Sequence, residues 1–305
     1  MLQYTLKRLL VAVLVALTVS VVNFSLLLAS GDIAASMAGE AASQAHIQAI
    51  RSHYGFDQPL LVQYFSWLGK ALTGDFGQSL YFKTPVIDIV LARLPVTMTL
   101  GVLAISFAIL LSIPLGVAAA VRPNGIVDRL VNIIAAIGQA LPNFWFALML
   151  IVLFSVTLSW LPPSGSDNWT HFVLPTIALG FHTSPALIRL TRAGMLEVLA
   201  SDYIRTARAK GVAPLSVFFK HALRNAIVPV VSLSAVQFGF MLGGSIVIES
   251  VFALHGTGFL AWEAIRGGDI PVVQAVLLLF SLFYIVLTFI ADLLNAWLDP
   301  RIRVA

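Results

Sequence analysis

The chain carries the stretch DYIRTARAKGVAPLSVFFKHALRN at residues 202–225, a polar and basic segment between two apolar runs long enough to cross a membrane. Its first half predicts a short helix that ends at Gly211, because glycine readily adopts the left-handed turn that terminates helices. The preference of Lys and Arg for the cytoplasmic side explains the charges of this loop. It does not explain the small residues around Ala207 and Gly211, so we predict that the loop docks a partner.

The composition excludes a soluble protein. Of the 305 residues, 59% are hydrophobic and 10% are charged, whereas a soluble chain carries roughly 25% charged residues. The formal net charge is +4, but the basic residues are scattered between apolar runs, which argues against a nucleic-acid partner. The chain has no cysteine, so disulfides and thiolate metal sites are impossible.

Hydropathy predicts an all-α polytopic membrane protein. About 20 apolar residues are needed for each helix that spans the hydrocarbon layer. The first such window follows Lys7 and Arg8 and is longer than the apolar core of a signal peptide, so we expect it to stay as a membrane anchor. Pro142 predicts a bend in the third window. The six predicted transmembrane helices lie near residues 9–29, 96–121, 131–161, 172–190, 227–252 and 272–298.

The distribution of Lys and Arg sets the predicted orientation, with both termini in the cytoplasm. Thirteen of these residues then lie inside: Lys7, Arg8, Arg122, Arg129, Arg189, Arg192, Arg205, Arg208, Lys210, Lys220, Arg224, Arg301 and Arg303. Five lie outside: Arg51, Lys70, Lys83, Arg93 and Arg266.

The predicted extracytoplasmic segment covers residues 31–94. Helical spacing of its apolar residues predicts two short amphipathic helices over 44–54 and 59–72, followed by a turn at 74–77. These helices either lie on the membrane surface or cap the bundle, or they contact an extracytoplasmic delivery protein. The remaining parts are a cytoplasmic N-terminus with the first helix (1–30) and a five-helix core (95–305) that contains the cytoplasmic loop (191–226).

Those motifs resemble a known family. The pattern Asp-Tyr-x-Arg-Thr-Ala-Arg-Ala-Lys-Gly, followed by His-Ala-Leu-Arg-Asn-Ala, is similar to the EAA loop of ATP-binding cassette (ABC) importer permeases, above all of the dipeptide/oligopeptide branch. The resemblance extends to residues 31–32, 54–60, 74–77, 269–274 and 299–303. The general Glu-Ala-Ala pattern falls on Arg205, Thr206 and Ala207, where only the final alanine is kept, and Arg224 replaces a proline.

The resemblance implies a role for the loop and a set of partners. The residues expected to dock a separate ATPase subunit are Asp202, Arg205, Thr206, Ala207, Arg208, Lys210, Gly211 and Leu223. Two ATP-binding subunits, a second homologous permease subunit and an extracytoplasmic solute-binding protein are implied, together with membrane lipid. The implied function is import of dipeptides, oligopeptides or a related small solute across the bacterial inner membrane by alternating access.

The sequence lacks the motifs of an enzyme. No phosphate-binding loop occurs, so ATP and Mg²⁺ are expected on the partner ATPase subunits and no cofactor is expected in this chain. His46 and His53 have no accompanying ligands, so we predict no metal site. The serines at 164, 166 and 245 are not paired with His255 in any pattern that specifies a nucleophile, so we predict no catalytic residue.

Polar residues inside the predicted helices mark a candidate pathway, because they are unfavourable in lipid. Gln139 and Asn143 flank Pro142, His182 lies in a sequence that predicts a break at Pro185, and Gln237 lies in the fifth helix. Hydrogen bonds between helices are the alternative role for all four. Glu249 and Asp292 are expected at the membrane interfaces, with Asp292 near cytoplasmic arginines.

Two other classes of membrane protein remain as alternatives. An ion-coupled secondary transporter would be expected to show paired intramembrane carboxylates and inverted repeats, and neither is visible. A structural or assembly protein would not need a docking loop that ends at Gly211. The substrate is left open among peptides, nickel chelates, glutathione and antimicrobial peptides.

Overall fold

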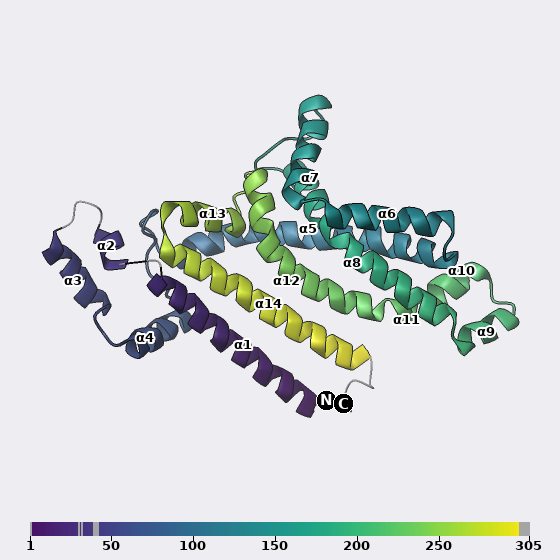
Figure 1. Cartoon of the computed structure of the whole chain (residues 1–305), viewed down its shortest axis with the longest axis horizontal. Helices are drawn as coiled ribbons and strands as arrows, with labels where there is room; N and C mark the ends of the chain where they lie inside the picture. Colours follow the sequence, from purple (N-terminus) through teal and green to yellow (C-terminus); the bar gives the residue numbers. More distant parts are fainter. Residues whose placement is uncertain (1, 30, 32, 39–42, 299–305) are drawn as a thin grey trace.

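The structure, a computed structural model, describes residues 2–29, 31, 33–38 and 43–298. Figure 1 shows an elongated bundle of helices that run roughly side by side. Within the described residues extended backbone pairs only at one isolated bridge, between Gln78 and Pro85. The predicted all-α fold is therefore confirmed. Arg301 and Arg303, which were assigned to the cytoplasm, lie outside the described residues.

Five continuous helices within the described residues are long and apolar enough to cross a membrane, and a bent pair gives a sixth candidate if its two parts form one span. The continuous helices are α1 (Leu2–Ala29), α5 (Val86–Val121), α8 (Val173–Leu199), α12 (Val228–Val251) and α14 (Ile270–Leu298). The bent pair consists of α6 (Ile126–Ala140), then α7 (Asn143–Leu150) with the π-helix η1 (Ile151–Thr157). All six predicted windows are therefore helical, and the third of them is broken.

The predicted bend at Pro142 is confirmed, but it is a break of 103° rather than a kink. A residue before proline is confined to extended backbone, and Leu141 accordingly has φ −75° and ψ 128°. Proline also lacks the N–H that would continue the helix. The chain then starts a new helix, in which the Asn143 side chain accepts a hydrogen bond from Phe144 N at 2.7 Å.

The predicted break at Pro185 is wrong, because α8 runs without interruption from Val173 to Leu199. Membrane helices tolerate proline where neighbouring helices and hydroxyl side chains re-satisfy the freed backbone groups. Ser184 Oγ donates to Gly180 O at 2.8 Å, and Ser112 Oγ on α5 donates to Ser184 O at 3.1 Å. The second bond also ties α8 to α5.

The centre of the bundle is the close pair α5 and α8. A Cβ at Gly180 would lie 2.6 Å from Ala104 O, and a Cβ at Gly116 would lie 2.9 Å from Ile188 O. Small residues of this kind let membrane helices approach closely. Outside this pair, Asn23 on α1 and Gln274 on α14 exchange hydrogen bonds, each side-chain amide donating to the other's backbone carbonyl at 3.1 and 3.2 Å.

Both predicted helices of the segment between α1 and α5 are present. The segment forms α2 (Ile33–Ala38), α3 (Gln44–Tyr54) and α4 (Leu60–Leu72). Tyr64 on α4 shares a hydrogen bond of 2.7 Å with Ser20 on α1, and its ring packs edge-on against Phe24 at 5.5 Å. These contacts join α4 to α1, while the role of the two short helices stays a prediction.

Glu249 lies near the end of α12, as expected, but its side chain is fully buried among helices. It accepts hydrogen bonds from Thr97 Oγ1 (2.8 Å), Ser245 Oγ (2.9 Å) and Phe259 N (2.9 Å). Phe259 lies in α13 (Thr257–Gly267), a helix that the sequence analysis missed. Gly258 permits this approach, because a Cβ there would lie 2.9 Å from the Glu249 carboxyl carbon. Glu249 therefore joins α5, α12 and α13.

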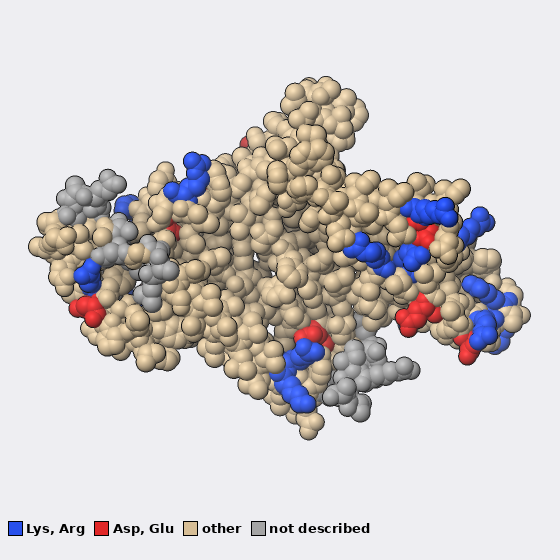
Figure 2. Space-filling view, in the orientation of Figure 1, with Lys and Arg blue, Asp and Glu red and all other residues tan. Residues whose placement is uncertain are grey.

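Asp292, near the end of α14, pairs with a basic residue as expected. Arg8 Nη1 on α1 lies 3.1 Å from Asp292 Oδ2, and Arg8 also stacks over the Tyr4 ring at 5.2 Å. Figure 2 shows charged side chains near the two ends of the long axis and at the lower edge, by the N-terminal end of α1 and the end of α14, with a wide band between these groups that carries almost none on this face. Such a band is what a helix bundle exposes to lipid.

Candidate functional site

The predicted loop helix is present as α9 (Asp202–Ala209) at one end of the bundle (Figure 1). An acidic residue, Asp202, occupies its first turn. The positive end of the helix dipole stabilises a negative charge at this position. Gly211 has φ +76°, the left-handed conformation that ends helices. Val212 N donates to Ala207 O at 3.2 Å and thereby closes the turn. The predicted end of the helix at Gly211 is confirmed.

The chain after this turn forms a platform beneath α9. It consists of α10 (Pro214–Ser216), the π-helix η3 (Val217–Ala222) and α11 (Leu223–Ala226). Ile204 on α9 is fully buried in a cluster with Met195 on α8 and Val217. Asn225 Nδ2 donates to Tyr203 Oη at 2.8 Å. These contacts hold α9 in a fixed orientation on the end of α8.

Most residues that the sequence assigned to docking form one exposed surface, which we call the α9 face. Its members are Asp202, Arg205, Thr206, Arg208, Lys210 and Gly211. Arg205 and Asp202 form an ion pair on this face. Figure 2 shows the Lys and Arg side chains gathered at this end of the molecule.

Two of the predicted docking residues lie differently. Ala207 is half-buried, and Leu223 is half-buried against the cluster that contains Ile204. Leu223 therefore supports α9 from below rather than standing on the α9 face. Its place in the motif reflects packing inside the loop.

The sequence analysis missed an apolar part of this surface. Leu215 is 72% exposed and Phe219 is 58% exposed, although both are large hydrophobic residues in a loop between spans. Exposed apolar groups beside basic groups are typical of a surface that a partner covers. Their spacing of four residues, on one side of a helical turn, was the available signal.

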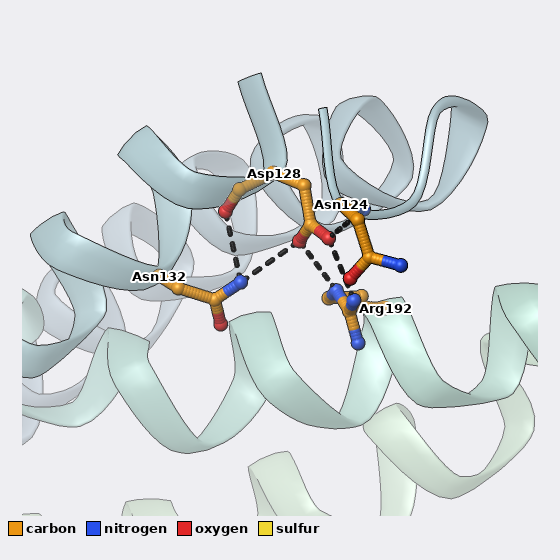
Figure 3. A network of polar contacts seen from close by, with 4 residues as sticks. All are labelled: Asn124, Asp128, Asn132 and Arg192. Atoms are coloured by element: carbon orange, nitrogen blue, oxygen red, sulfur yellow. Dashed lines mark hydrogen bonds and ion pairs between the residues drawn. The ribbon is translucent and has the colours of Figure 1, made fainter. Parts of the chain in front are cut away.

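A polar network joins α6 to α8 near the same end of the bundle (Figure 3). Arg192 binds Asp128 through two parallel contacts, Nε to Oδ1 at 2.6 Å and Nη2 to Oδ2 at 2.7 Å. Asn124 N and Asn132 Nδ2 each donate to the same carboxylate at 2.8 Å. We call this network the Asp128–Arg192 clamp. A bidentate pair fixes direction as well as distance, so the start of α6 is held to α8 ten residues before α9.

The candidate pathway residues gather in part at the break between α6 and α7. Gln139 is exposed near the end of α6, and Asn143 begins α7. A Cβ at the adjacent Gly138 would lie 3.1 Å from the Pro185 ring, so this break packs beside the turn of α8 that carries His182. His182 is exposed in the single chain.

Gln237 lies elsewhere. It is half-buried on α12, and no hydrogen bond among the described residues joins it to the other three candidates. Across the described part of the chain, no group of three His, Cys, Asp or Glu residues is arranged to hold a metal ion.

Comparison with known families gives two matches. Residues 112–304 match the family described as the binding-protein-dependent transport system inner membrane component. Residues 1–101 match the N-terminal family of the same transport-system membrane components.

Among curated proteins, the chain is similar to the glutathione transport system permease protein GsiC of Escherichia coli strain K12. The two are 42% identical over 304 residues, which is 99% of each chain. GsiC of Salmonella typhimurium strain LT2 shows the same identity and coverage.

Among solved structures, the inward-facing MetNI methionine ABC transporter has a similar fold. A chain of its native crystal form aligns with a TM-score of 0.59 at 20% identity, covering 69% of this chain and 96% of that one. Its selenomethionine-soaked form aligns with a TM-score of 0.58 over the same shares. At this identity the likeness concerns the fold alone.

Proposed function

Because the chain belongs to the family of inner membrane components of binding-protein-dependent transport systems, we propose that its α9 face is the surface on which a separate ATPase subunit docks. The chain itself is a multi-pass permease subunit of an ABC importer, and its relatives are transport subunits rather than enzymes. The alternative of an ion-coupled secondary transporter is therefore set aside.

The observation that carries the docking proposal is the combination of exposure and rigidity at α9. The helix exposes basic groups, including Arg205, Arg208 and Lys210, while Ile204 and Tyr203 fix it to the platform below. A partner with acidic groups can pair with the basic residues and cover Leu215 and Phe219 in the same contact. Because α9 is already fixed to the platform, a movement of such a partner would displace α8 directly, with no need to order α9 first.

The further partners follow from the transport class. We propose two ATPase subunits that carry ATP and Mg²⁺, a second homologous permease chain, and a solute-binding protein on the opposite side of the membrane. In this arrangement both termini and α9 face the cytoplasm, and residues 31–94 lie outside. The uneven distribution of Lys and Arg supports that orientation.

The substrate class proposed is a dipeptide, an oligopeptide or a related small solute. The relatives are named for glutathione, which is itself a small peptide. We propose that the solute passes the break between α6 and α7, where Gln139, Asn143 and His182 supply polar groups at membrane depth. Alternating access would open this region first to one side of the membrane and then to the other.

Co-purification of the ATPase subunit with a tagged permease chain tests the docking proposal. Arg205→Glu reverses a charge on the α9 face, and Phe219→Asp removes its exposed apolar group. Both variants should retain the permease in the membrane and lose most of the bound ATPase. Lys83→Glu changes an exposed charge in the loop between α4 and α5 and serves as the control, with full ATPase recovery. Normal recovery with both α9-face variants would refute docking at this surface.

A further inference from the structure

A groove runs between α1 and α14 at the end of the bundle where the N-terminus lies. Figure 1 shows the two helices side by side, with the start of α1 next to the end of α14. Arg8 and Asp292 stand at the mouth of the groove, and the rest of its lining is mostly apolar. The apolar part consists of Val11, Ala12 and Val15 on α1, and Tyr284, Ile285 and Phe289 on α14.

The charged pair at the mouth retains donors for a further ligand. Arg8 Nη1 lies 3.1 Å from Asp292 Oδ2, and Arg8 Nε donates to Tyr4 Oη at 3.1 Å. A guanidinium group has five N–H donors, so Arg8, whose side chain is 43% exposed, can bind another acceptor. Lys7 is exposed one position away. Two cations beside one carboxylate leave a net positive charge near the mouth, which favours a negatively charged group.

A hydroxyl one turn deeper in the groove also lacks a partner. Thr288 lines the groove, and its Oγ1 is buried without a hydrogen bond to any residue that the structure describes. Hydroxyl groups in membrane helices ordinarily bond a backbone carbonyl or a neighbouring helix. Rotation of the side chain to another staggered position moves the hydroxyl, so that it can donate to an acceptor bound in the groove.

The depths of these groups match the parts of a phospholipid. At 1.5 Å per residue, Thr288 lies about 6 Å further along the helix axis than Asp292, and Tyr284 lies about 12 Å further. The headgroup region of a bilayer is about 5–8 Å thick on each side of the hydrocarbon layer. With Arg8 at the level of the phosphates, Thr288 lies at the level of the glycerol esters, and Val15 lies within the hydrocarbon.

We propose that this groove binds one phospholipid, with the phosphate on Arg8, an ester carbonyl at Thr288 and an acyl chain between Val15 and Ile285. The lipid comes from the leaflet at the N-terminal end of α1, which is the cytoplasmic leaflet in the proposed orientation. Bound there, it joins the first half of α1 to α14, as the hydrogen bonds between Asn23 and Gln274 join them further along. The site uses no residue of the α9 face, so it does not depend on ATPase docking.

Photolabelling of the complex in detergent tests the site. The complex is purified through a tag on the permease chain, and phosphatidylglycerol with a diazirine in one acyl chain is added at trace concentration. Mass spectrometry locates the adducts after illumination. Adducts in the groove should fall several-fold when unlabelled phosphatidylglycerol is added in excess. They should persist when diacylglycerol with the same acyl chains, or inorganic phosphate, is added instead, because neither supplies both the phosphate and the chains.

A matched pair of variants tests the position of the lipid. Ala12→Phe fills the groove without removing a charged group, and groove adducts should fall several-fold. Val13 is 48% exposed and is not part of the groove lining, so Val13→Phe adds the same side chain elsewhere on α1 and should leave these adducts unchanged. The competition measured on the unaltered chain guards against a variant that fails to assemble.

Two results would overturn the inference. One is displacement of the groove adducts by diacylglycerol or by inorganic phosphate as strong as that by phosphatidylglycerol, since either would leave no role for an intact phospholipid. The other is labelling of the exposed face of α1, at Val13 or Leu14, with no adduct in the groove. That result would show that another part of the complex covers the groove.

Discussion

Gly211 offers the sharpest test of the docking surface. Its φ of +76° is a conformation that side chains with a Cβ adopt at a cost, yet a Cβ placed there would meet no atom of the chain within 4 Å. A substitution at this position therefore strains the backbone of the turn without crowding the chain itself. The loss of docking in each variant then depends on two factors. One is the strain in the backbone of the turn, and the other is the space that the bound ATPase subunit leaves for the new side chain.

The expected magnitude follows from the left-handed region alone. Alanine in this region costs about 1–2 kcal/mol relative to glycine, which lowers the population of the native turn roughly 5–30-fold. Valine should be worse, because its branched side chain is stiff next to the backbone. Asparagine tolerates the left-handed region while carrying a larger side chain than alanine. If the turn decides docking, ATPase recovery should fall in the order Gly, Asn, Ala, Val.

The assay is the amount of ATPase subunit that co-purifies with the tagged permease, followed by substrate-stimulated ATP hydrolysis of the reconstituted complex. Gly74 provides a matched control, because its φ is +79° and its Cβ would also meet nothing within 4 Å. Gly74 lies in the loop after α4, so Gly74→Ala introduces the same strain away from α9. Full ATPase recovery with Gly211→Val would refute the reasoning. If asparagine lowers ATPase recovery as much as valine does, the space that the ATPase subunit leaves for a side chain decides docking, and not the backbone conformation of the turn.

Four further outcomes are expected. A reporter fused at Gln58 should lie outside the cytoplasm and one fused at the C-terminus inside; a cytoplasmic signal at Gln58 would contradict the proposed orientation. The purified permease alone should hydrolyse no ATP, and activity should appear only with its cognate subunits. Glu249→Leu should lower the melting temperature of the purified complex, because each buried donor left unsatisfied, such as Phe259 N, costs about 1–3 kcal/mol; an unchanged melting temperature would argue against the network. His182→Leu should reduce uptake at normal complex yield, whereas unchanged uptake would assign His182 to packing.

Local signals predicted the parts of the fold that depend on neighbouring residues. Hydropathy located the spans, and the glycine at 211 located the end of α9, because both follow from a few consecutive residues. The start of α5 was placed ten residues late, at 96 instead of Val86. Asp88 and Arg93 lower the hydropathy there, yet the helix extends past the apolar run, and Arg93 Nη1 lies 3.3 Å from Glu263 Oε2.

Contacts between distant residues were not predictable from the single sequence. Asp128 and Arg192 are separated by 64 positions, and nothing in either local sequence shows that they pair. The burial of Glu249 could not be foreseen because α13, which supplies one of its donors, carries no strong helical pattern. A proline usually breaks a helix, so the sequence predicted a break at Pro185. The Ser112 hydroxyl that binds the α8 backbone belongs to another helix, and the local sequence therefore could not show this contact.

The continuity of α8 changes how the proposed docking surface connects to the pathway. A break at Pro185 would have separated His182 from α9 and allowed the two parts to move independently. Instead one rigid helix carries His182, then Arg192 of the clamp, and ends three residues before α9 begins. The clamp adds the start of α6 to the same unit, and Gly180 adds α5. A displacement of α9 by an ATPase subunit would therefore move α5, α6 and α8 together, which places the flexible point at the α6–α7 break, where the helical hydrogen bonds are interrupted.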